Sequence, residues 1–163
     1  MRSISAGTSS TYSDVSLDVL PNIEDFNGDF AAFNAVLIDE FRANGGTVTG
    51  MFGGAPLVLI TTTGAKSGKS RTTPIVYTTD GDNLVIIASK GGAPTSPDWF
   101  HNLVANPDVT VELPNEKFEA RARVAAEPER ERLYGAQAAL MPNFAEYEKA
   151  TTRKIPVVVL ERV

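Results

Sequence analysis

The clearest chemical signal in this chain is a loop rich in glycine, hydroxyl and cationic residues between two apolar runs. The loop and its flanks have the sequence Thr61-Thr-Thr-Gly-Ala-Lys-Ser-Gly-Lys-Ser-Arg-Thr-Thr-Pro74. Cationic side chains, hydroxyl groups and N–H groups around glycines are the usual ligands of phosphate. No Asp or Glu occurs from residue 41 to residue 79, although the chain has a formal net charge of −5. The sequence therefore predicts an anion-binding loop, with a solvated hairpin tip as the alternative.

The spacing of the glycines excludes a nucleotide-triphosphate P-loop. Only three residues separate Gly64 from Gly68, where a P-loop needs four. A P-loop must also lead into a helix, whereas residues 71–79 are rich in β-branched side chains and are interrupted by Pro74. We therefore expect a strand-loop-strand hairpin that does not bind ATP or GTP.

A second candidate anion site follows the next apolar run, in the segment Ala88-Ser-Lys-Gly-Gly92. Lys90 supplies charge, the two glycines allow close approach of the backbone, and the helix expected to follow adds N–H donors. An ordinary helix-entry loop is the alternative. Two such loops in one small domain favour a phosphorylated cofactor.

Composition limits the remaining possibilities. The 163 residues, of which 42% are hydrophobic and 21% charged, are sufficient for one globular domain. With no cysteine and one histidine, disulfides, thiolate sites and multi-histidine metal sites are excluded, and no metal is expected. The acidic balance argues against nucleic acid as a partner. No apolar run is long enough to span a membrane and no signal peptide is evident, so we expect a cytoplasmic protein, with peripheral membrane association left open.

Hydrophobic periodicity predicts a flexible N-terminal arm over residues 1–24 and a single domain over residues 25–163. An amphipathic helix is expected at 25–44. Ser96 is predicted to cap a helix that begins with Pro97 and runs to 104, and a further helix is predicted at 127–140. Asn143 and Glu146 are expected to form a capping box for a third. Strands are expected at 56–62, 73–79, 84–88, 109–113, 118–124 and 156–161, in an α+β, β-barrel-like fold and not a Rossmann fold.

Four motifs together resemble the deazaflavin-dependent nitroreductases. They are T-T-T-G-x-K-S-G-x-x-R-x-x-P at 61–74, A-S-K-G-G at 88–92, P-x-W-x-x-N-L at 97–103 and I-P-V-V-V-L-E at 155–161. The resemblance covers about residues 28–162. It implies a split β-barrel of about six mainly antiparallel strands with flanking helices, and reduced coenzyme F420, an 8-hydroxy-5-deazaflavin, as the hydride donor.

The resemblance also implies roles for individual residues. Lys66, Arg71 and Lys90 would hold the cofactor phosphate and tail carboxylates, whereas Lys69 lies at a variable position of the family and His101 is expected to be a packing or surface residue. Trp99 belongs to the same motif set, with plain core packing as its alternative. The other residues expected to bind cofactor are Thr73, Pro74, Ala88, Ser89, Gly91, Gly92 and Asn102.

The implied activity is hydride transfer to an electron-poor acceptor: an α,β-unsaturated ester or lactone, a quinone or a nitroaromatic compound. Ser89, Tyr147 or water would donate the proton. The best-known member of the family has three tyrosines near its last helix. Here Met141 and Phe144 replace two of them and only Tyr147 is kept, while Val76 replaces another aromatic residue. The expected acceptor pocket therefore favours apolar lactones or quinones over polar nitroimidazoles.

Two other functions remain open at this stage. Split barrels that use FMN also hold a phosphate with Lys and Arg, so an FMN-dependent reductase or oxidase is one alternative. A non-catalytic deazaflavin carrier is the other. The expected partner is a small-molecule hydride acceptor, and the sequence is compatible with a monomer or a homodimer.

Overall fold

The computed structural model describes residues 30–48 and 55–163. The chain divides into two compact units, one made of Met1–Ala55 with Leu113–Asn115 and the other of Pro56–Glu112 with Glu116–Val163. The predicted arm, residues 1–24, and the first residues of the predicted 25–44 helix lie outside the described residues.

The first unit contains helix α1, Phe30–Ala43. Its apolar residues recur at three- to four-residue spacing, and Phe33, Leu37 and Phe41 are buried, as an amphipathic helix requires. The turn after the helix is closed by the Gly46 N–H, which donates to the Phe41 carbonyl at 2.8 Å. Gly46 has a φ of +92°, and a Cβ there would lie 2.4 Å from Cγ of Pro114, so this position requires glycine.

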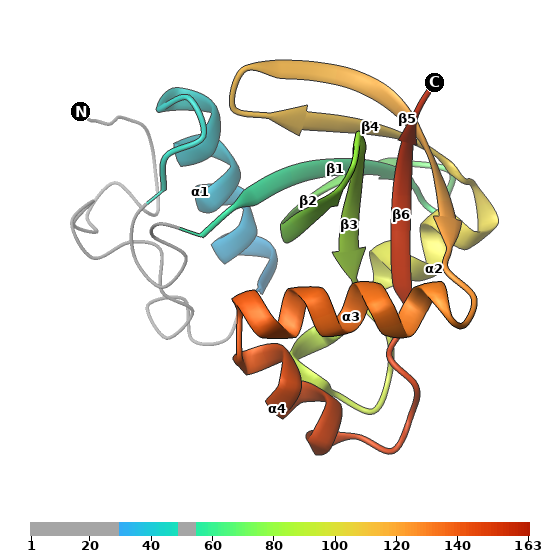
Figure 1. Cartoon of the computed structure of the whole chain (residues 1–163). Helices are drawn as coiled ribbons and strands as arrows, with labels where there is room; N and C mark the ends of the chain where they lie inside the picture. The colour runs from blue at the N-terminus through green and yellow to red at the C-terminus, as the bar shows by residue number, and fades with distance from the viewer. Residues whose placement is uncertain (1–29, 49–54) are drawn as a thin grey trace. The chain divides into compact units, whose positions relative to one another are not determined.

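Six strands form a closed barrel in the order β1-β2-β3-β6-β5-β4 (Figure 1). Every pair whose register is described is antiparallel. The predicted split-barrel fold and all six predicted strands are confirmed. The strands are β1 Leu57–Thr63, β2 Ser70–Asp80, β3 Asn83–Ile87, β4 Asp108–Leu113, β5 Glu116–Val124 and β6 Val157–Arg162.

Strands β3 and β6 are apolar on both faces because each face is covered. Alternate side chains of these strands point to opposite faces of the sheet. One set joins a cluster with residues of α3 (Glu129–Leu140) and α4 (Asn143–Ala150), the two helices drawn in orange and red below the strands in Figure 1. The other set is equally buried and points into the barrel. The set under the helices is Val85, Ile87, Val157 and Val159, and the inward set is Leu84, Ile86, Val158 and Leu160.

Strand β2 is longer than its neighbour β3, and this difference opens the barrel wall. Only Tyr77–Asp80 pairs with β3, whereas Ser70–Val76 pairs only with β1. The unpaired edge of β2 accommodates Pro74, which has no N–H to donate to a second neighbour. Both predicted anion loops lie at this end of the strands, because one precedes β2 and the other follows the antiparallel β3.

The two predicted side-chain caps are wrong. Helix α2, Asp98–Ala105, is preceded by Pro97 with no side-chain cap, and the Ser96 hydroxyl instead accepts a hydrogen bond from Arg153 at 3.2 Å. Helix α4 is preceded by Pro142, and Asn143 uses its side-chain N–H to donate to the Tyr147 hydroxyl at 2.9 Å. In both cases a tertiary or intrahelical partner takes the polar side chain that the motif assigns to capping.

Within the described ranges, no helix has the length and apolar character needed to cross a membrane.

Candidate active site

The loop between β1 and β2 is a tight turn that leaves amide donors available. The Gly64 N–H donates to the Lys69 carbonyl at 2.8 Å, and the Gly68 N–H donates to the Gly64 carbonyl at 3.0 Å. Gly68 has a φ of +69°, which favours glycine. The N–H groups of Lys66 and Ser67 have no partner in the described part of the chain. The turn therefore offers unpaired donors at the tip that carries the cations.

Within residues 30–48 and 55–163, no acidic side chain neutralises the cations of the two loops. Lys66, Lys69, Arg71 and Lys90 are all exposed. None of them has a carboxylate partner among the described residues. Their positive charge is available to an anionic ligand, and the donor set fits the phosphate and carboxylates of a deazaflavin cofactor.

Asn102 of α2 holds the first loop in place. Its Oδ1 accepts the Ala65 N–H at 3.0 Å and its Nδ2 donates to the Thr62 hydroxyl at 3.4 Å. The side chain is 9% exposed, so its amide is committed to these contacts. Trp99 on the same helix is 8% exposed and packs edge-on against Phe100 at 6.5 Å between ring centroids. Asn102 is thus placed to position the first loop, whereas the ring contact of Trp99 is with the adjacent Phe100 of its own helix.

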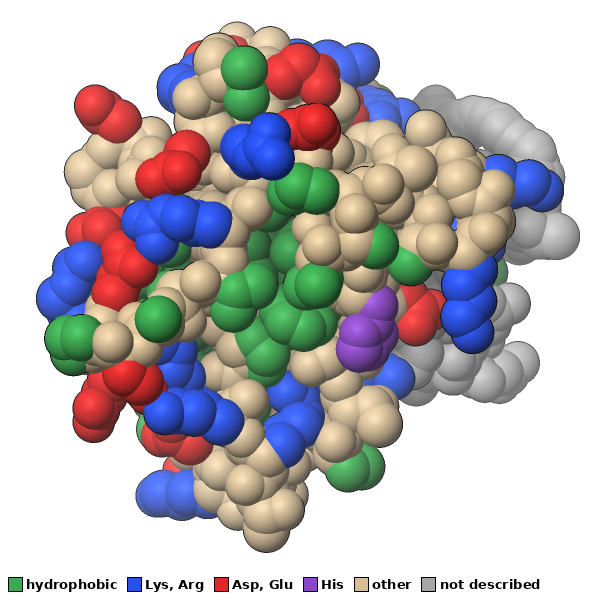
Figure 2. Space-filling model, turned by 90° about the vertical axis from the view of Figure 1, so that its right-hand side faces the viewer, with side chains coloured by type: hydrophobic (Ala, Val, Ile, Leu, Met, Phe, Trp, Pro, Cys, Tyr) green, Lys and Arg blue, Asp and Glu red, His purple; other side chains and the backbone are tan. Residues whose placement is uncertain are grey.

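His101, on the same helix as Asn102, is exposed, with its ring 5.8 Å from that of Phe100. The histidine, purple in Figure 2, lies at the surface as expected. The described residues contain no group of three His, Cys, Asp or Glu side chains that could hold a metal ion.

The second loop has an unusual backbone. Ser89 is right-handed, with φ −77° and ψ −38°, whereas Lys90 has φ +49° and Gly91 has φ +64°. Gly92 has φ +84° and packs on α4, where an added Cβ would lie 3.0 Å from the Tyr147 carbonyl oxygen and 2.9 Å from Cβ of Ala150. Gly92 therefore brings this loop into direct contact with the helix that carries Tyr147.

Arg153 is a site residue that the sequence interpretation missed. It donates to the carbonyls of Ala88 (3.1 Å), Ser89 (2.9 Å) and Ala93 (2.9 Å), and to the Ser96 hydroxyl. It precedes β6 in a segment that has no glycine, and both acidic and basic residues surround it in the sequence. Only its proximity to the second loop in space reveals its role.

The four predicted acceptor residues gather in one cluster. Phe144 is buried in the cluster under α3 and α4, and Val76, Met141 and Tyr147 pack against that cluster. The rings of Phe144 and Tyr147 meet edge to face at 5.2 Å between centroids. Of the four, Tyr147 is the one whose backbone lies against the second loop, at Gly92.

Two hydroxyl groups in this region are free to meet a ligand. The Ser89 side chain is 7% exposed and its hydroxyl has no hydrogen bond within the described residues. The Tyr147 hydroxyl accepts from Asn143, which leaves its own proton free to be donated.

Tyr134, by contrast, has a structural role that the sequence did not indicate. Its hydroxyl donates to the Phe144 carbonyl at 2.6 Å, and burial raises its pKa to about 12. The Arg130 guanidinium lies 4.9 Å from the centre of its ring and donates through Nε to the Ile155 carbonyl. These contacts fix the start of α4 and keep Tyr134 neutral.

A surface groove of about 310 Å³ lies between β2 and α3. Met141 and Leu133 line this groove and also belong to or pack against the acceptor cluster, so the groove and the cluster are adjacent. The groove is also lined by Pro56, Tyr77, Thr78, Thr79, Asp80, Arg132, Ala136 and Leu140.

Comparison with known families agrees with this geometry. The family of F420H(2)-dependent quinone reductases matches residues 36–162. The chain belongs to this family. An F420H(2)-dependent quinone reductase of Mycobacterium tuberculosis is 41% identical to this reductase over 126 residues, which cover 75% of this chain and 85% of the relative.

Two solved structures are also similar to the reductase. An F420-H2-dependent reductase is 40% identical, with a TM-score of 0.61 over 65% of this chain and 94% of that chain. A structure described as a domain-swapped dimer is 40% identical, with a TM-score of 0.61 over 65% of this chain and 80% of that chain. The predicted family, the oxidoreductase activity and the F420 cofactor are confirmed.

Proposed function

We propose that this reductase transfers two electrons from F420H2 to an apolar quinone bound beside Tyr147. The observation that carries the proposal is the packing of Gly92 on α4, which joins the loop that carries Lys90 to the cluster of acceptor residues. The names of the similar proteins support quinones as the acceptor class over the lactones and nitroaromatics that the resemblance also allowed.

The cations of the two loops would hold the anionic part of the cofactor. Lys66, Arg71 and Lys90 have no internal counterions among the described residues, and their charge-assisted hydrogen bonds suit phosphate and carboxylate oxygens. Asn102 would position the first loop through its contacts with Ala65 and Thr62. When bound, F420H2 supplies the hydride. The residues proposed to line the cofactor are Thr73, Pro74, Ala88, Ser89, Gly91 and Gly92.

Tyr147 is the proposed proton donor to the acceptor oxygen. Its hydroxyl accepts from Asn143 and therefore presents its proton outward from that contact. Ser89 would stabilise negative charge on the same oxygen. Tyr147→Phe should lower the turnover number for a quinone about a hundredfold and leave F420 affinity unchanged. An unaltered turnover number would assign the proton to Ser89 or water.

The surface groove is proposed to hold the apolar tail of the quinone, because Met141 and Leu133 border both the groove and the acceptor cluster. Ala136→Trp would fill the groove from α3. We expect this variant to raise the Michaelis constant for a prenylated naphthoquinone and not for the same ring without a tail. Equal effects on both substrates would place the tail elsewhere.

Cofactor titration tests the whole proposal. Purified protein is titrated with oxidised F420, FMN and NADPH, with fluorescence as the signal, and quinone reduction is then followed with F420H2. Selective F420 binding and quinone turnover are expected. Binding of FMN alone would identify an FMN-dependent split-barrel enzyme, and F420 binding without turnover of any acceptor would identify a carrier.

We further propose a homodimer, supported by the similar structure described as a domain-swapped dimer. Light scattering coupled to gel filtration at several protein concentrations decides between the dimer and a monomer.

A further inference from the structure

Arg153 forms four contacts, all with the segment that follows β3. Nε donates to the Ala93 carbonyl, one terminal nitrogen donates to the Ser96 hydroxyl, and the other donates to the Ala88 and Ser89 carbonyls. These donor-acceptor distances lie between 2.9 and 3.2 Å. The planar fork of the guanidinium thus spans the entire turn.

All of these partners are neutral. The side chain is only partly exposed, and no carboxylate contacts it in the described part of the chain. A partly buried cation without a counterion is unfavourable by itself. Among the described residues its positive charge is therefore not neutralised by a carboxylate, and it can stabilise an anion that binds near Ser89 and Lys90.

The carbonyl contacts fix the direction of two amide groups. In a planar trans peptide, the C=O of one residue points opposite to the N–H of the next. Arg153 binds the carbonyls of Ala88 and Ser89, so the N–H groups of Ser89 and Lys90 point away from it. A right-handed residue followed by a left-handed one makes successive N–H groups converge in an anion-binding nest, and Ser89 and Lys90 have these conformations. The N–H groups of Ser89, Lys90 and Gly91 have no partner among the described residues.

We propose that Arg153 is a positioning residue that holds the Ser89–Gly91 amides as a preformed nest for an anionic oxygen. The proposal deepens the proposed function and rests on it. The oxygen belongs either to the bound cofactor or to the quinone as it gains negative charge. Both have the same chemistry, and binding and turnover measurements separate them.

The test compares Arg153→Gln with Arg123→Gln. Arg123 also forms three side-chain hydrogen bonds, to Glu129 and Glu161, but it lies on the barrel wall and serves as the control for a lost arginine network. Arg153→Lys keeps the positive charge but lacks the planar guanidinium. The same measurements are made on this variant if Arg153→Gln does not fold.

If the oxygen belongs to the cofactor, Arg153→Gln should weaken binding of oxidised F420 about tenfold or more, since the loss of one good hydrogen bond to a charged group is of this order. Arg153→Lys should recover only part of this loss. If the oxygen belongs to the quinone, F420 affinity is unchanged and kcat/KM for the quinone falls about tenfold at saturating F420H2. Unchanged values of both quantities in Arg153→Gln would overturn the proposal.

A readout without cofactor separates this proposal from the proposed function. In ¹⁵N spectra of the ligand-free protein, the Ser89, Lys90 and Gly91 amide signals should shift or broaden in Arg153→Gln and stay in place in Arg123→Gln. Unmoved signals in Arg153→Gln would overturn the positioning role of Arg153 even if F420 binds. If the wild-type protein does not bind F420 but these signals are displaced in the variant, the proposed function is overturned and the positioning role of Arg153 stands.

Discussion

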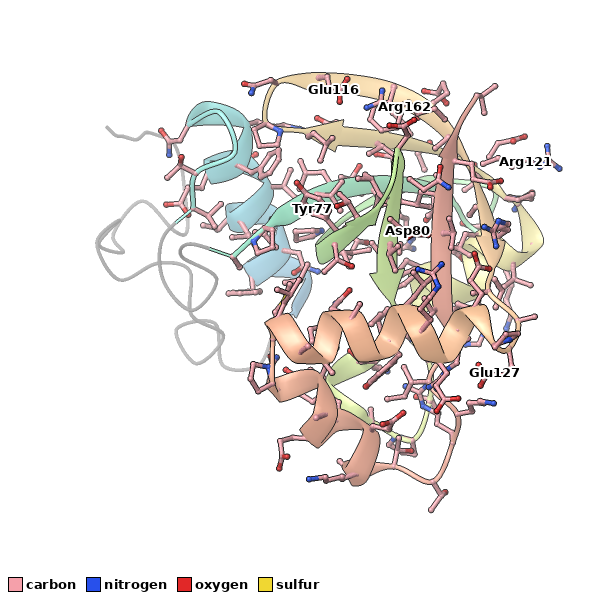
Figure 3. The ribbon with its side chains drawn as sticks, viewed as in Figure 1. Tyr77, Asp80, Glu116, Arg121, Glu127 and Arg162 are labelled. Atoms are coloured by element: carbon pink, nitrogen blue, oxygen red, sulfur yellow. The ribbon has the colours of Figure 1, made fainter. Side chains whose placement is uncertain are left out.

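The cations of this protein occur in two settings, and the comparison shows which of them can act on a ligand. On the outside of the barrel, Arg123 lies 2.6 Å from Glu129, and Arg162 lies 2.6 Å from Glu116. Glu116 and Arg162 are labelled next to each other in Figure 3. In the two loops, Lys66, Arg71 and Lys90 have no such partner among the described residues.

The difference arises from where the acidic residues are. On the outside of the barrel, basic and acidic side chains lie next to one another. Figure 2 shows the two kinds interleaved along the left side of the view. Residues 41–79 contain no Asp or Glu at all. Charge on the wall is therefore neutralised locally, whereas charge in the loops stays available to a ligand, although the chain as a whole is acidic.

The largest expected effect on cofactor affinity comes from removing the loop cations. Lys66→Ala and Arg71→Ala should each weaken F420 binding by about 1.5 to 3 kcal/mol, the range for a charge-assisted hydrogen bond. Fluorescence titration at two salt concentrations measures it, and the loss should shrink at high salt. Arg121→Ala, which removes an exposed wall cation that pairs with Asp108 at 3.5 Å, is the control and should leave affinity unchanged. An equal loss of F420 affinity in all three variants would show that the loop cations and the paired cations outside the barrel do not differ in their effect on the ligand.

The second effect tests the packing of the second loop. Gly92→Ala should destabilise the protein by about 2 to 4 kcal/mol, because the new Cβ meets the Tyr147 backbone and the φ of +84° disfavours any side chain. Gly91→Ala is the matched control, since it has a φ of +64° but nothing within 4 Å, and should cost about 1 kcal/mol. Urea unfolding measures both. A larger loss for Gly91→Ala would show that Gly92 does not contact α4.

Loss of the Asn102 contacts that hold the first loop should have a smaller effect on stability. Asn102→Ala leaves the Ala65 N–H and the Thr62 hydroxyl without their partner and should cost about 1 to 3 kcal/mol of stability, with weaker F420 binding. Asn106→Ala is the control, because it loses only one 3.4 Å contact to the Thr63 carbonyl. Equal F420 affinity in the wild type and Asn102→Ala would show that the loop keeps its conformation without the Asn102 hydrogen bonds.

The smallest expected effect is the change of folding stability at acid pH that comes from the ion pairs on the outside of the barrel. The hydrogen bond from Arg162 lowers the pKa of Glu116 below its ordinary value of 4.5, and Arg123 acts in the same way on Glu129. The unfolded chain then binds more protons than the folded one, so this stability is present above pH 4.5 and is lost as the pH falls through the lowered pKa values. Arg162→Gln should flatten the fall in urea midpoint below pH 4.5. An identical acid profile in this variant would show that the pair contributes nothing.

Much of the fold is determined locally, and these parts could be predicted. Alternating or continuous apolar runs between polar turns placed all six strands, since burial of one or both faces leaves this pattern in the sequence. The glycine and cation loops were identified because phosphate binding requires those residue types within a few positions of one another. The two cap predictions were wrong because Ser96 lies one residue before the N-cap of α2 and Asn143 lies one residue after the N-cap of α4, and their side chains contact Arg153 and Tyr147.

The sequence by itself determined the strand set, the two cationic loops and the family of this reductase, because each depends on residues that are neighbours along the chain. Only the tertiary structure decided that Asn102 braces the first loop, that Gly92 rests on α4 and that Arg153 holds the second loop. These contacts join residues tens of positions apart. Their partners include backbone N–H and C=O groups, which every residue carries, so no residue type or spacing marks them in advance.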